Sequence, residues 1–474
     1  MSLKALIWIG LFVSLSTLSF RRSSWAVPLY LLTYYAGPAN WWWGSGALTS
    51  TGIRWNLMAA MIFAAAVLFD GRRRTEGMRK PATAVFLLML LYALNASAVH
   101  FLYASDPIRS WLGLQLLWKR SGLLLLMLAS VRNKFDLRIL VISILIGSAY
   151  IGYEVVLNAE GHYLDGRLEG IGIAGASEAN AVAQILCVAL PLGAYLLFHG
   201  NKMEKPFALA SLVLVLEVIQ RCVSRAASLA LIGAAAWLIV RARGRVRRQI
   251  IGGVALGVLG VFILMGEVDR SRNIARLATV LAGTEERDES AQSRIYFWEA
   301  ALAMVQDHPF GWGFEATETS AGTPYLRDVG VDESHAIHNG YLDIAVSWGV
   351  QGLALYLAVI FLAWRSVHAS ISLAYSAGDE SVAFFGHCIE AVLLTQLVSC
   401  MFASTLDAEV VVWWIALAAT YPSAFPSTKT ETCEQELGEV SQSGSGKEEP
   451  LPHQTVLRPT RSPSADFQAD APGN

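Results

Sequence analysis

The chain has 474 residues, of which 54% are hydrophobic and 16% are charged, and its mean hydropathy is +0.44. An average soluble domain is about 45–50% apolar and about 25% charged, so the composition argues strongly against a water-soluble fold. The formal net charge is −2, and no overall basic character points to a nucleic-acid partner. Long apolar runs alternate with short charged clusters, which is typical of a polytopic helical membrane protein in a lipid bilayer.

The first apolar run ends at Phe20 and is followed by Arg21 and Arg22. It lacks the small-residue exit of a signal peptide, so we expect it to be retained as a first membrane span. The five cysteines suggest neither a disulfide framework nor a C-x-x-C metal site.

Basic clusters such as Asp70–Lys80 and Arg241–Gln249 mark the cytoplasmic ends of the expected spans, because short loops rich in Lys and Arg stay in the cytoplasm. One or two spans precede Trp43. The others are expected near residues 53–69, 82–103, 110–131, 137–157, 178–199, 206–220, 226–240, 250–266, 344–364, 381–404 and 409–425. At about 20 residues per crossing, we expect an all-α polytopic membrane protein with about twelve or thirteen transmembrane helices.

This alternation places Asn158–Ser177, the turn Arg221–Arg225 and the long loop Glu267–Asp343 outside the cytoplasm. The loop contains fourteen acidic residues, six arginines and no lysine. Its segment Ser293–Gln306 has helical periodicity, and Asn339–Val346 is expected to form a second, shorter helix. We therefore divide the chain into a transmembrane domain, 1–425, which includes the extracytoplasmic loop 267–343, and a Ser-, Pro- and Glu-rich cytoplasmic tail, 426–474, expected to be disordered.

Four arginines lie where the expected extracytoplasmic segments meet the membrane: Arg167, Arg221, Arg225 and Arg294. Arginine keeps its charge, and its planar fork of donors matches phosphate oxygens. Each could instead pair with a carboxylate or reach a lipid headgroup. Because three separate junctions use arginine and never lysine, the pattern favours a joint site for a lipid-linked pyrophosphate.

Two histidines, His335 and His338, precede Asn339 where the long loop re-enters the membrane. An unperturbed imidazole, with a pKa of about 6.5, can accept a proton from a sugar hydroxyl. The histidines could alternatively ligate a metal or buttress the re-entering helix, but their spacing matches no zinc signature. The chain has no Asp-x-Asp pair, and the first extracytoplasmic loop, Gly37–Gly52, has no carboxylate, which disfavours a metal-dependent sugar transferase.

Lys119 and Arg120 interrupt the expected span 110–131. Charges inside a span usually line a bundle interior or a water-filled cavity, where the pair could lie beside a lipid phosphate. Alternatively, Ser105–Arg120 is an interfacial helix and the pair lies at its end. The sequence leaves both interpretations open.

An ordered set of motifs extends over about residues 160–360. It comprises R-x-x-G at Arg167–Gly170, Ser224-Arg225 opening a span, Ser293–Glu299 opening the loop helix, P-x-G-x-G at Pro309–Gly313, and HNGYLD at His338–Asp343 followed by Gly349 and Gly352. This set resembles the O-antigen ligase / O-antigen polymerase family of bacterial polytopic membrane glycosyltransferases. No single motif is specific, whereas the ordered set is.

The resemblance implies a metal-independent, inverting glycosyltransferase at the outer face of the bacterial cytoplasmic (inner) membrane, acting in surface polysaccharide or lipopolysaccharide biosynthesis. The donor would be an undecaprenyl-pyrophosphate-linked glycan, and the acceptor lipid A–core, a growing glycan or a protein. On this sequence, Arg167, Arg225 and Arg294 would hold the pyrophosphate, and His338 would deprotonate or orient the acceptor hydroxyl. We assign five further residues to substrate binding: Arg221, Lys119, Arg120, His335 and Asn339.

Three features depart from the family pattern. Arg167 is followed by Leu-Glu-Gly and then by Gly175–Asn180, a loose match to the family's Asn-containing turn, Glu178 adds a carboxylate near the expected phosphate site, and the long tail is unusual. These concern the donor more than the type of reaction. Ligase, polymerase and protein O-oligosaccharyltransferase remain open within the family. A polysaccharide flippase or exporter is the alternative from another class, but it would need polar residues along several spans, and a non-enzymatic scaffold is a third.

Overall fold

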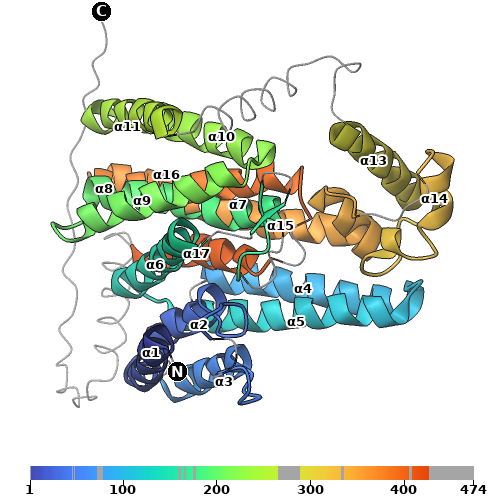
Figure 1. The fold of residues 1–474 in the computed structure, drawn as a ribbon, viewed down its shortest axis with the longest axis horizontal. Coiled ribbons are helices and arrows are strands. Elements are labelled where there is room, and N and C mark those ends of the chain that lie inside the picture. Colours follow the sequence, from blue (N-terminus) through green and yellow to red (C-terminus); the bar gives the residue numbers. More distant parts are fainter. Residues whose placement is uncertain are drawn as a thin grey trace, which may run out of the picture. The chain divides into compact units, whose positions relative to one another are not determined.

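The helices of the chain run side by side in a computed structural model (Figure 1). The structure describes residues 2–44, 46, 48–71, 78, 80–158, 162–164, 167–173, 178–264, 289–331, 336–404 and 408–425. The tail that we expect to be disordered, 426–474, lies outside the described residues. All the helices below belong to one compact unit, Met1–Pro426.

Nearly all regular structure in the described residues is helical. The N-terminal third contains α1 (Leu3–Arg21), η1 (Ser23–Trp25), α2 (Ala26–Tyr35), α3 (Trp55–Phe69), α4 (Lys80–Tyr103), α5 (Pro107–Ser130) and α6 (Lys134–Asn158). The middle contains β1 (Tyr163–Leu164), β2 (Arg167–Leu168), α7 (Ala179–Cys187), α8 (Ala189–His199), α9 (Glu204–Arg221), α10 (Arg225–Arg241) and α11 (Gly244–Leu264). The last part contains α13 (Glu289–Asp307), η4 (Ala316–Glu318), α14 (Thr323–Asp328), α15 (Gly340–Ser376), α16 (Glu380–Cys400) and α17 (Val410–Ala424).

Seven helical segments of the described residues are long and apolar enough to cross a membrane: α1, α4, α5, α6, the consecutive pair α7–α8, α15 and α16. Two shorter apolar helices, α3 and α17, accompany them. The expected all-α polytopic membrane protein is therefore confirmed, while the count of twelve or thirteen spans stays a prediction. The span expected at 178–199 is divided at Val188 into α7 and α8.

The direction of α1 is fixed by ion pairs at both of its ends. Near its start, the Lys4 ammonium lies 2.6 Å from a carboxylate oxygen of Glu154, close to the end of α6. Just past its other end, the Arg22 guanidinium lies 2.7 Å from Asp136, in the first turn of α6. Helix α1 therefore runs antiparallel to α6, and the N-terminus lies at the same end of the helices as Asn158.

A sharp kink divides α15 at Gly349, whose φ is +80°. In a regular helix the Val350 N–H would bond to the Val346 carbonyl. Here the Val350 N–H donates to the Pro309 carbonyl at 2.9 Å instead, and the Val346 carbonyl accepts from the Trp312 N–H at 2.8 Å. The segment Asn339–Val346 that we expected as a second, shorter helix is thus part of α15, joined to the following span through this kink.

The loop Pro309–Gly313 satisfies the backbone groups that the kink releases. The Gly313 N–H donates to the Ser347 carbonyl at 3.0 Å, and the Asn95 amide from α4 donates to the Trp348 carbonyl at 2.8 Å. An unsatisfied backbone group in a membrane costs several kcal/mol, so the kink and the loop depend on each other. A Cβ at Gly311 would lie 2.7 Å from the Gly349 nitrogen, which explains why glycine is needed at this crossing.

Candidate functional site

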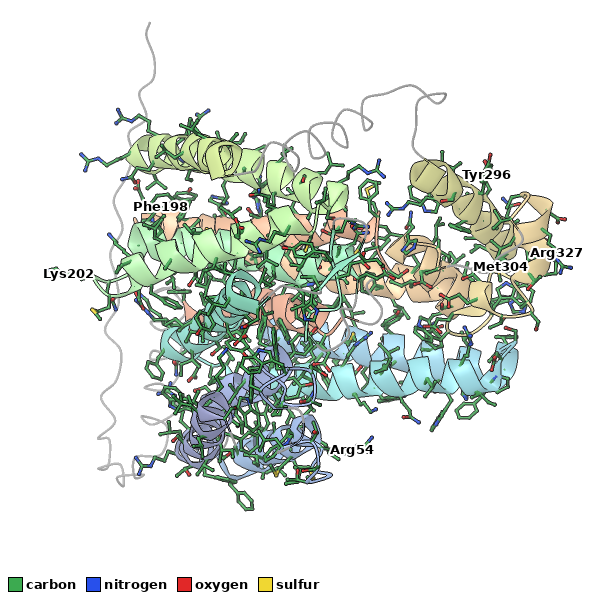
Figure 2. The ribbon with its side chains drawn as sticks, in the orientation of Figure 1. Arg54, Phe198, Lys202, Tyr296, Met304 and Arg327 are labelled. Atoms are coloured by element: carbon green, nitrogen blue, oxygen red, sulfur yellow. The ribbon has the colours of Figure 1, made fainter. Side chains whose placement is uncertain are left out.

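One end of the bundle, which we call the site end, gathers the residues that the sequence singled out. At this end α9 finishes at Arg221, α10 begins at Arg225 and α15 begins at Gly340. The hairpin β1–β2 carries Arg167, with Tyr163 opposite Leu168 and Leu164 opposite Arg167. Figure 2 marks Tyr296 and Arg327 at this end and Lys202 at the opposite end.

Asn180, in the first turn of α7, links Arg167 to the start of α10. Its side-chain oxygen accepts hydrogen bonds from the Arg167 guanidinium at 3.0 Å and from the Ser224 hydroxyl at 2.8 Å. The same hydroxyl caps α10 by accepting from the Ala227 N–H at 3.3 Å. Arg225, the first residue of α10, follows Ser224 directly. One asparagine therefore ties the Arg167 guanidinium to the turn that precedes Arg225.

Further contacts fix the Arg167 guanidinium from two sides. Its Nε donates to the Cys222 carbonyl at 3.3 Å, and its Nη1 lies 3.8 Å from the Glu169 carboxylate. Burial raises the pKa of the Cys222 thiol to about 12, so this cysteine stays a neutral part of the turn. Asn180 gave no clear signal in the sequence, because an asparagine at the start of an apolar helix is most often a local cap.

We expect replacement of Asn180 by alanine to weaken donor binding by about tenfold or more, since a hydrogen bond to a charged group contributes about 1.5–3 kcal/mol. The donor KM should rise, while the acceptor KM should change little. Steady-state kinetics with each substrate varied in turn measures this difference. Asn158→Ala is the matched control, because Asn158 bonds to Glu154 and touches neither arginine. An unchanged donor KM in Asn180→Ala would contradict the positioning role.

His338 occupies a left-handed backbone conformation, with a φ of +51°, just before α15. Asn339 follows it as the cap of α15, accepting from the N–H groups of Tyr341 at 3.1 Å and Leu342 at 3.2 Å. The expected substrate-binding role of Asn339 therefore competes with a structural one. His338 is half-buried, and the preceding residue, Ile337, is buried.

Helix α13 brings Arg294 toward His338. The Trp298 indole donates to the Ile337 carbonyl at 3.2 Å, which ties α13 to the residue before His338. Arg294 lies four residues before Trp298 and so projects from the same face of α13, one turn away. The helix that carries Arg294 is thus bonded to the residue that precedes His338, and the hairpin that carries Arg167 is bonded through Asn180 to the turn that precedes Arg225.

Three non-glycine residues in the described part of the chain have positive φ, and all three lie at the site end: Val223, Glu315 and His338. A β-branched residue such as Val223 rarely adopts this conformation. Strained backbone of this kind costs about 1–3 kcal/mol per residue and concentrates at functional sites. The strain therefore supports a functional role for the turns that carry Arg225 and His338.

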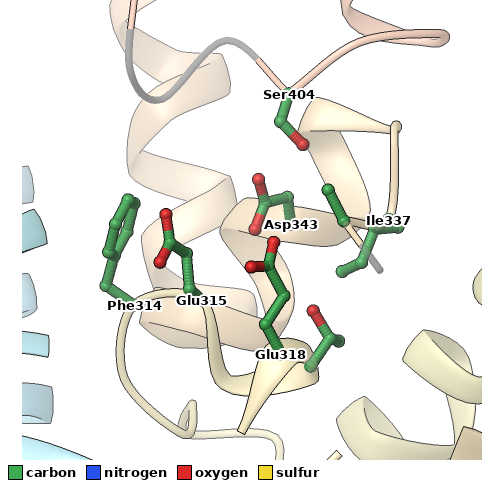
Figure 3. Close-up of a pocket in the computed structure, with 8 residues that line it drawn as sticks. Phe314, Glu315, Glu318, Ile337, Asp343 and Ser404 are labelled. Atoms are coloured by element: carbon green, nitrogen blue, oxygen red, sulfur yellow. The ribbon is translucent and has the colours of Figure 1, made fainter. Parts of the chain in front are cut away.

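A small cavity of about 40 Å³ lies beside Ile337. Figure 3 shows the carboxylates of Glu315, Glu318 and Asp343 directed toward a common space, with the Ser404 hydroxyl above it. The Arg109 guanidinium lies 3.7 Å from Glu315 and 3.5 Å from Glu318, which offsets part of the negative charge. Within the described residues, no group of three or more His, Cys, Asp and Glu side chains is arranged to hold a metal ion.

The remaining expected residues lie in different surroundings. Arg221 forms an ion pair with Glu217 at 2.7 Å and also bonds to the Tyr163 hydroxyl, so its fork is already engaged. Helix α5 continues through Lys119 and Arg120, which matches the first of the two alternatives for this pair. Arg120 is 8% exposed and Lys119 is exposed, so the two side chains face different surroundings. His335 lies outside the described residues.

The segment that forms most of this site also matches a known family. Residues 205–357 match the family model described as O-antigen ligase. This segment is therefore similar to the O-antigen ligases. It contains Arg221, Arg225, Arg294 and His338, whereas Arg167, Lys119 and Arg120 precede it. The predicted relationship to the O-antigen ligases is thus confirmed, and no curated protein sequence matches the chain significantly.

Proposed function

We propose that the chain is a membrane glycosyltransferase of the O-antigen ligase or polymerase type. It transfers a glycan from an undecaprenyl-pyrophosphate donor to an acceptor hydroxyl at the outer face of the cytoplasmic membrane, for surface polysaccharide or lipopolysaccharide. The observation that carries the proposal is the pair of hydrogen bonds to the Asn180 side-chain oxygen. They hold Arg167 beside Ser224, the residue before Arg225 at the start of α10. With its guanidinium directed to the same side, Arg225 would join Arg167 in binding the two phosphates of a pyrophosphate.

The proposed reaction is a single displacement. The acceptor oxygen attacks the anomeric carbon, its proton passes to His338, and the bond from the anomeric carbon to the pyrophosphate oxygen breaks. The arginines stabilise the charge that develops on the leaving pyrophosphate, and preorganised groups of this kind usually give the largest catalytic contribution. Attack from the opposite face inverts the anomeric centre, and no metal takes part.

The acceptor can be lipid A–core, a growing glycan or a protein hydroxyl, and we favour the first two. A flippase or exporter is supported less well. Charged side chains of the described helices pair across helices, at the helix ends in Lys4 with Glu154 and Arg22 with Asp136, and within a span in Glu390 with His368 at 2.9 Å.

The proposal is tested with purified full-length protein, an undecaprenyl-pyrophosphate glycan and the candidate acceptors. Arg225→Ala and Arg294→Ala should each lower kcat about 10²–10³-fold, the usual effect of removing one group that stabilises transition-state charge. EDTA should leave the wild-type rate unchanged. Arg327→Ala is the matched control, since Arg327 lies in α14 of the same loop and we assign it no role. Full activity in both site variants would overturn the arginine assignment, and EDTA sensitivity would favour a metal-dependent reaction.

The proposed sidedness predicts that an impermeant maleimide labels Ser320→Cys in intact cells. Ser320 is exposed in the long loop, whereas Cys433, in the tail expected in the cytoplasm, should react only after permeabilisation. Each cysteine is measured in a chain in which the other position is serine. The reverse labelling pattern would invert the orientation. The native thiols of the described helices and turns are buried and should not react with the maleimide: Cys187, Cys222, Cys388 and Cys400.

A further inference from the structure

Five arginines lie at the junction of α10 and α11, at the end of α10 opposite to Arg225: Arg241, Arg243, Arg245, Arg247 and Arg248. Apart from Arg241, which is half-buried, they are exposed. Arginines elsewhere pair closely with carboxylates, as Arg22 does with Asp136 and Arg221 with Glu217. No carboxylate of a described residue forms an ion pair with any of the five.

Aromatic rings hold two of these arginines in place. The Arg241 guanidinium lies 4.4 Å from the centre of the Trp237 ring, and the Arg243 guanidinium lies 4.4 Å from the centre of the Tyr375 ring at the end of α15. Trp364 packs edge-on against Trp237 at 5.4 Å. A guanidinium held over an aromatic ring directs its N–H donors outward in its own plane, where they can bond to an anion. Tryptophans at the end of a membrane helix usually lie at headgroup depth.

Helix α11 adds an apolar surface directly beside the arginines. Val246 and Ile250 face the bundle, whereas Leu256 is 70% exposed and Val258 is 65% exposed. A phospholipid has the same two parts, a phosphate followed by acyl chains. Since 250–266 is an expected span, the exposed face of α11 would lie against acyl chains, and the arginines at its start would lie where the phosphate of such a lipid is.

We propose that the arginines of 241–248 bind the phosphate of an anionic phospholipid, with its acyl chains along α11. This site lies at the end of α10 opposite to the proposed transfer site and is independent of the proposed function. Trp237 and Tyr375 orient the two stacked guanidinium groups toward the headgroup. Arg245, Arg247 and Arg248 add local positive charge, each contributing to the attraction of anionic lipids.

The site must be distinguished from a general excess of positive charge at this end of the membrane, which orients many membrane proteins. Lysine serves that purpose as well as arginine does, but it lacks the planar fork and stacks less well. The double variant Arg241→Lys/Arg243→Lys therefore preserves the charge and the topology while removing the proposed recognition. The control, Lys202→Gln/Lys205→Gln, removes two exposed charges at the same end of the helices.

The experiment reconstitutes full-length protein in nanodiscs of equal phosphatidylglycerol and phosphatidylcholine and counts retained lipids by native mass spectrometry. The wild-type protein should retain more phosphatidylglycerol than phosphatidylcholine. Arg241→Lys/Arg243→Lys should lower that preference about two- to fivefold for each lost stacking contact, and Lys202→Gln/Lys205→Gln should leave it unchanged. Equal retention in wild type and the lysine variant would overturn the proposal, as would an equal loss in the control.

Two further arms test other occupants. The segment 427–474 contains acidic residues that could form ion pairs with the arginines. Four of them are therefore changed to glutamine in the full chain: Glu431, Glu434, Glu436 and Glu439. A phosphatidylglycerol preference that appears only in this variant would assign the arginines to the tail and overturn the lipid proposal. Complete displacement of the lipid by inorganic phosphate would likewise indicate a site for a soluble anion.

Discussion

Replacement of His338 by alanine is expected to lower the transfer rate about 10²–10⁴-fold, the usual contribution of a general base. The physical reason is that the acceptor hydroxyl must lose its proton as the bond to the anomeric carbon forms. Product formation by the purified variant at saturating donor and acceptor measures this loss. The KM for the donor should change little, because the arginines, not His338, are expected to hold the pyrophosphate.

The left-handed backbone at His338 separates a catalytic role from a structural one. Glycine adopts a φ near +51° without the cost that other residues incur, so His338→Gly should melt no lower than His338→Ala. Both variants should nevertheless lose activity to a similar extent. His162→Ala is the matched control, since the His162 side chain is exposed at the site end and its backbone carbonyl, which accepts from Glu169, is kept. An active His338→Gly protein would show that the histidine serves only the helix start.

The helices could be predicted from the sequence because an apolar run between charged clusters must satisfy its backbone hydrogen bonds within a membrane, and an α-helix does so within one segment. Helix α5 is expected at 110–131 and extends over Pro107–Ser130, and α10 is expected at 226–240 and extends over Arg225–Arg241. The break at Val188 and the kink at Gly349 could not be predicted. The kink depends on backbone contacts between α15 and the distant loop Pro309–Gly313, which hydropathy does not report.

The site was only partly predictable for a similar reason. Arg167, Arg225 and His338 could be proposed because arginines without lysines, and a histidine, stand where the expected extracytoplasmic segments meet the membrane. The role of Asn180 and the cavity formed by Glu315, Glu318 and Asp343 could not, because they depend on how α7, α15 and the long loop come together. The positive φ of Val223 had no sequence signal, since valine is among the last residues expected there.

Gly349→Ala is expected to destabilise the protein and to abolish transfer, although Gly349 touches no substrate. Gly349 has a φ of +80° and a ψ of +169°, a conformation in which a residue with a Cβ is strained by about 1–3 kcal/mol. The added Cβ would also meet the Gln351 side chain and would lie 2.5 Å from the Phe310 carbonyl oxygen. To relieve this contact, the loop Pro309–Gly313 must leave the kink, which exposes the backbone groups that it satisfies. The start of α15, and with it His338, would then change direction. Thermal unfolding and the transfer assay measure the two effects.

Gly257→Ala separates this effect from a general change of glycine to alanine in a membrane helix. Gly257 lies in α11, and a Cβ there would meet no atom within 4 Å. Alanine at that position should leave transfer unchanged and slightly stabilise the helix, by up to about 1 kcal/mol. If Gly349→Ala retained full activity and an unchanged melting temperature, the kink would be incidental to the site. If it lost activity while its melting temperature stayed high, the kink would act by aiming His338 and not by holding the fold together.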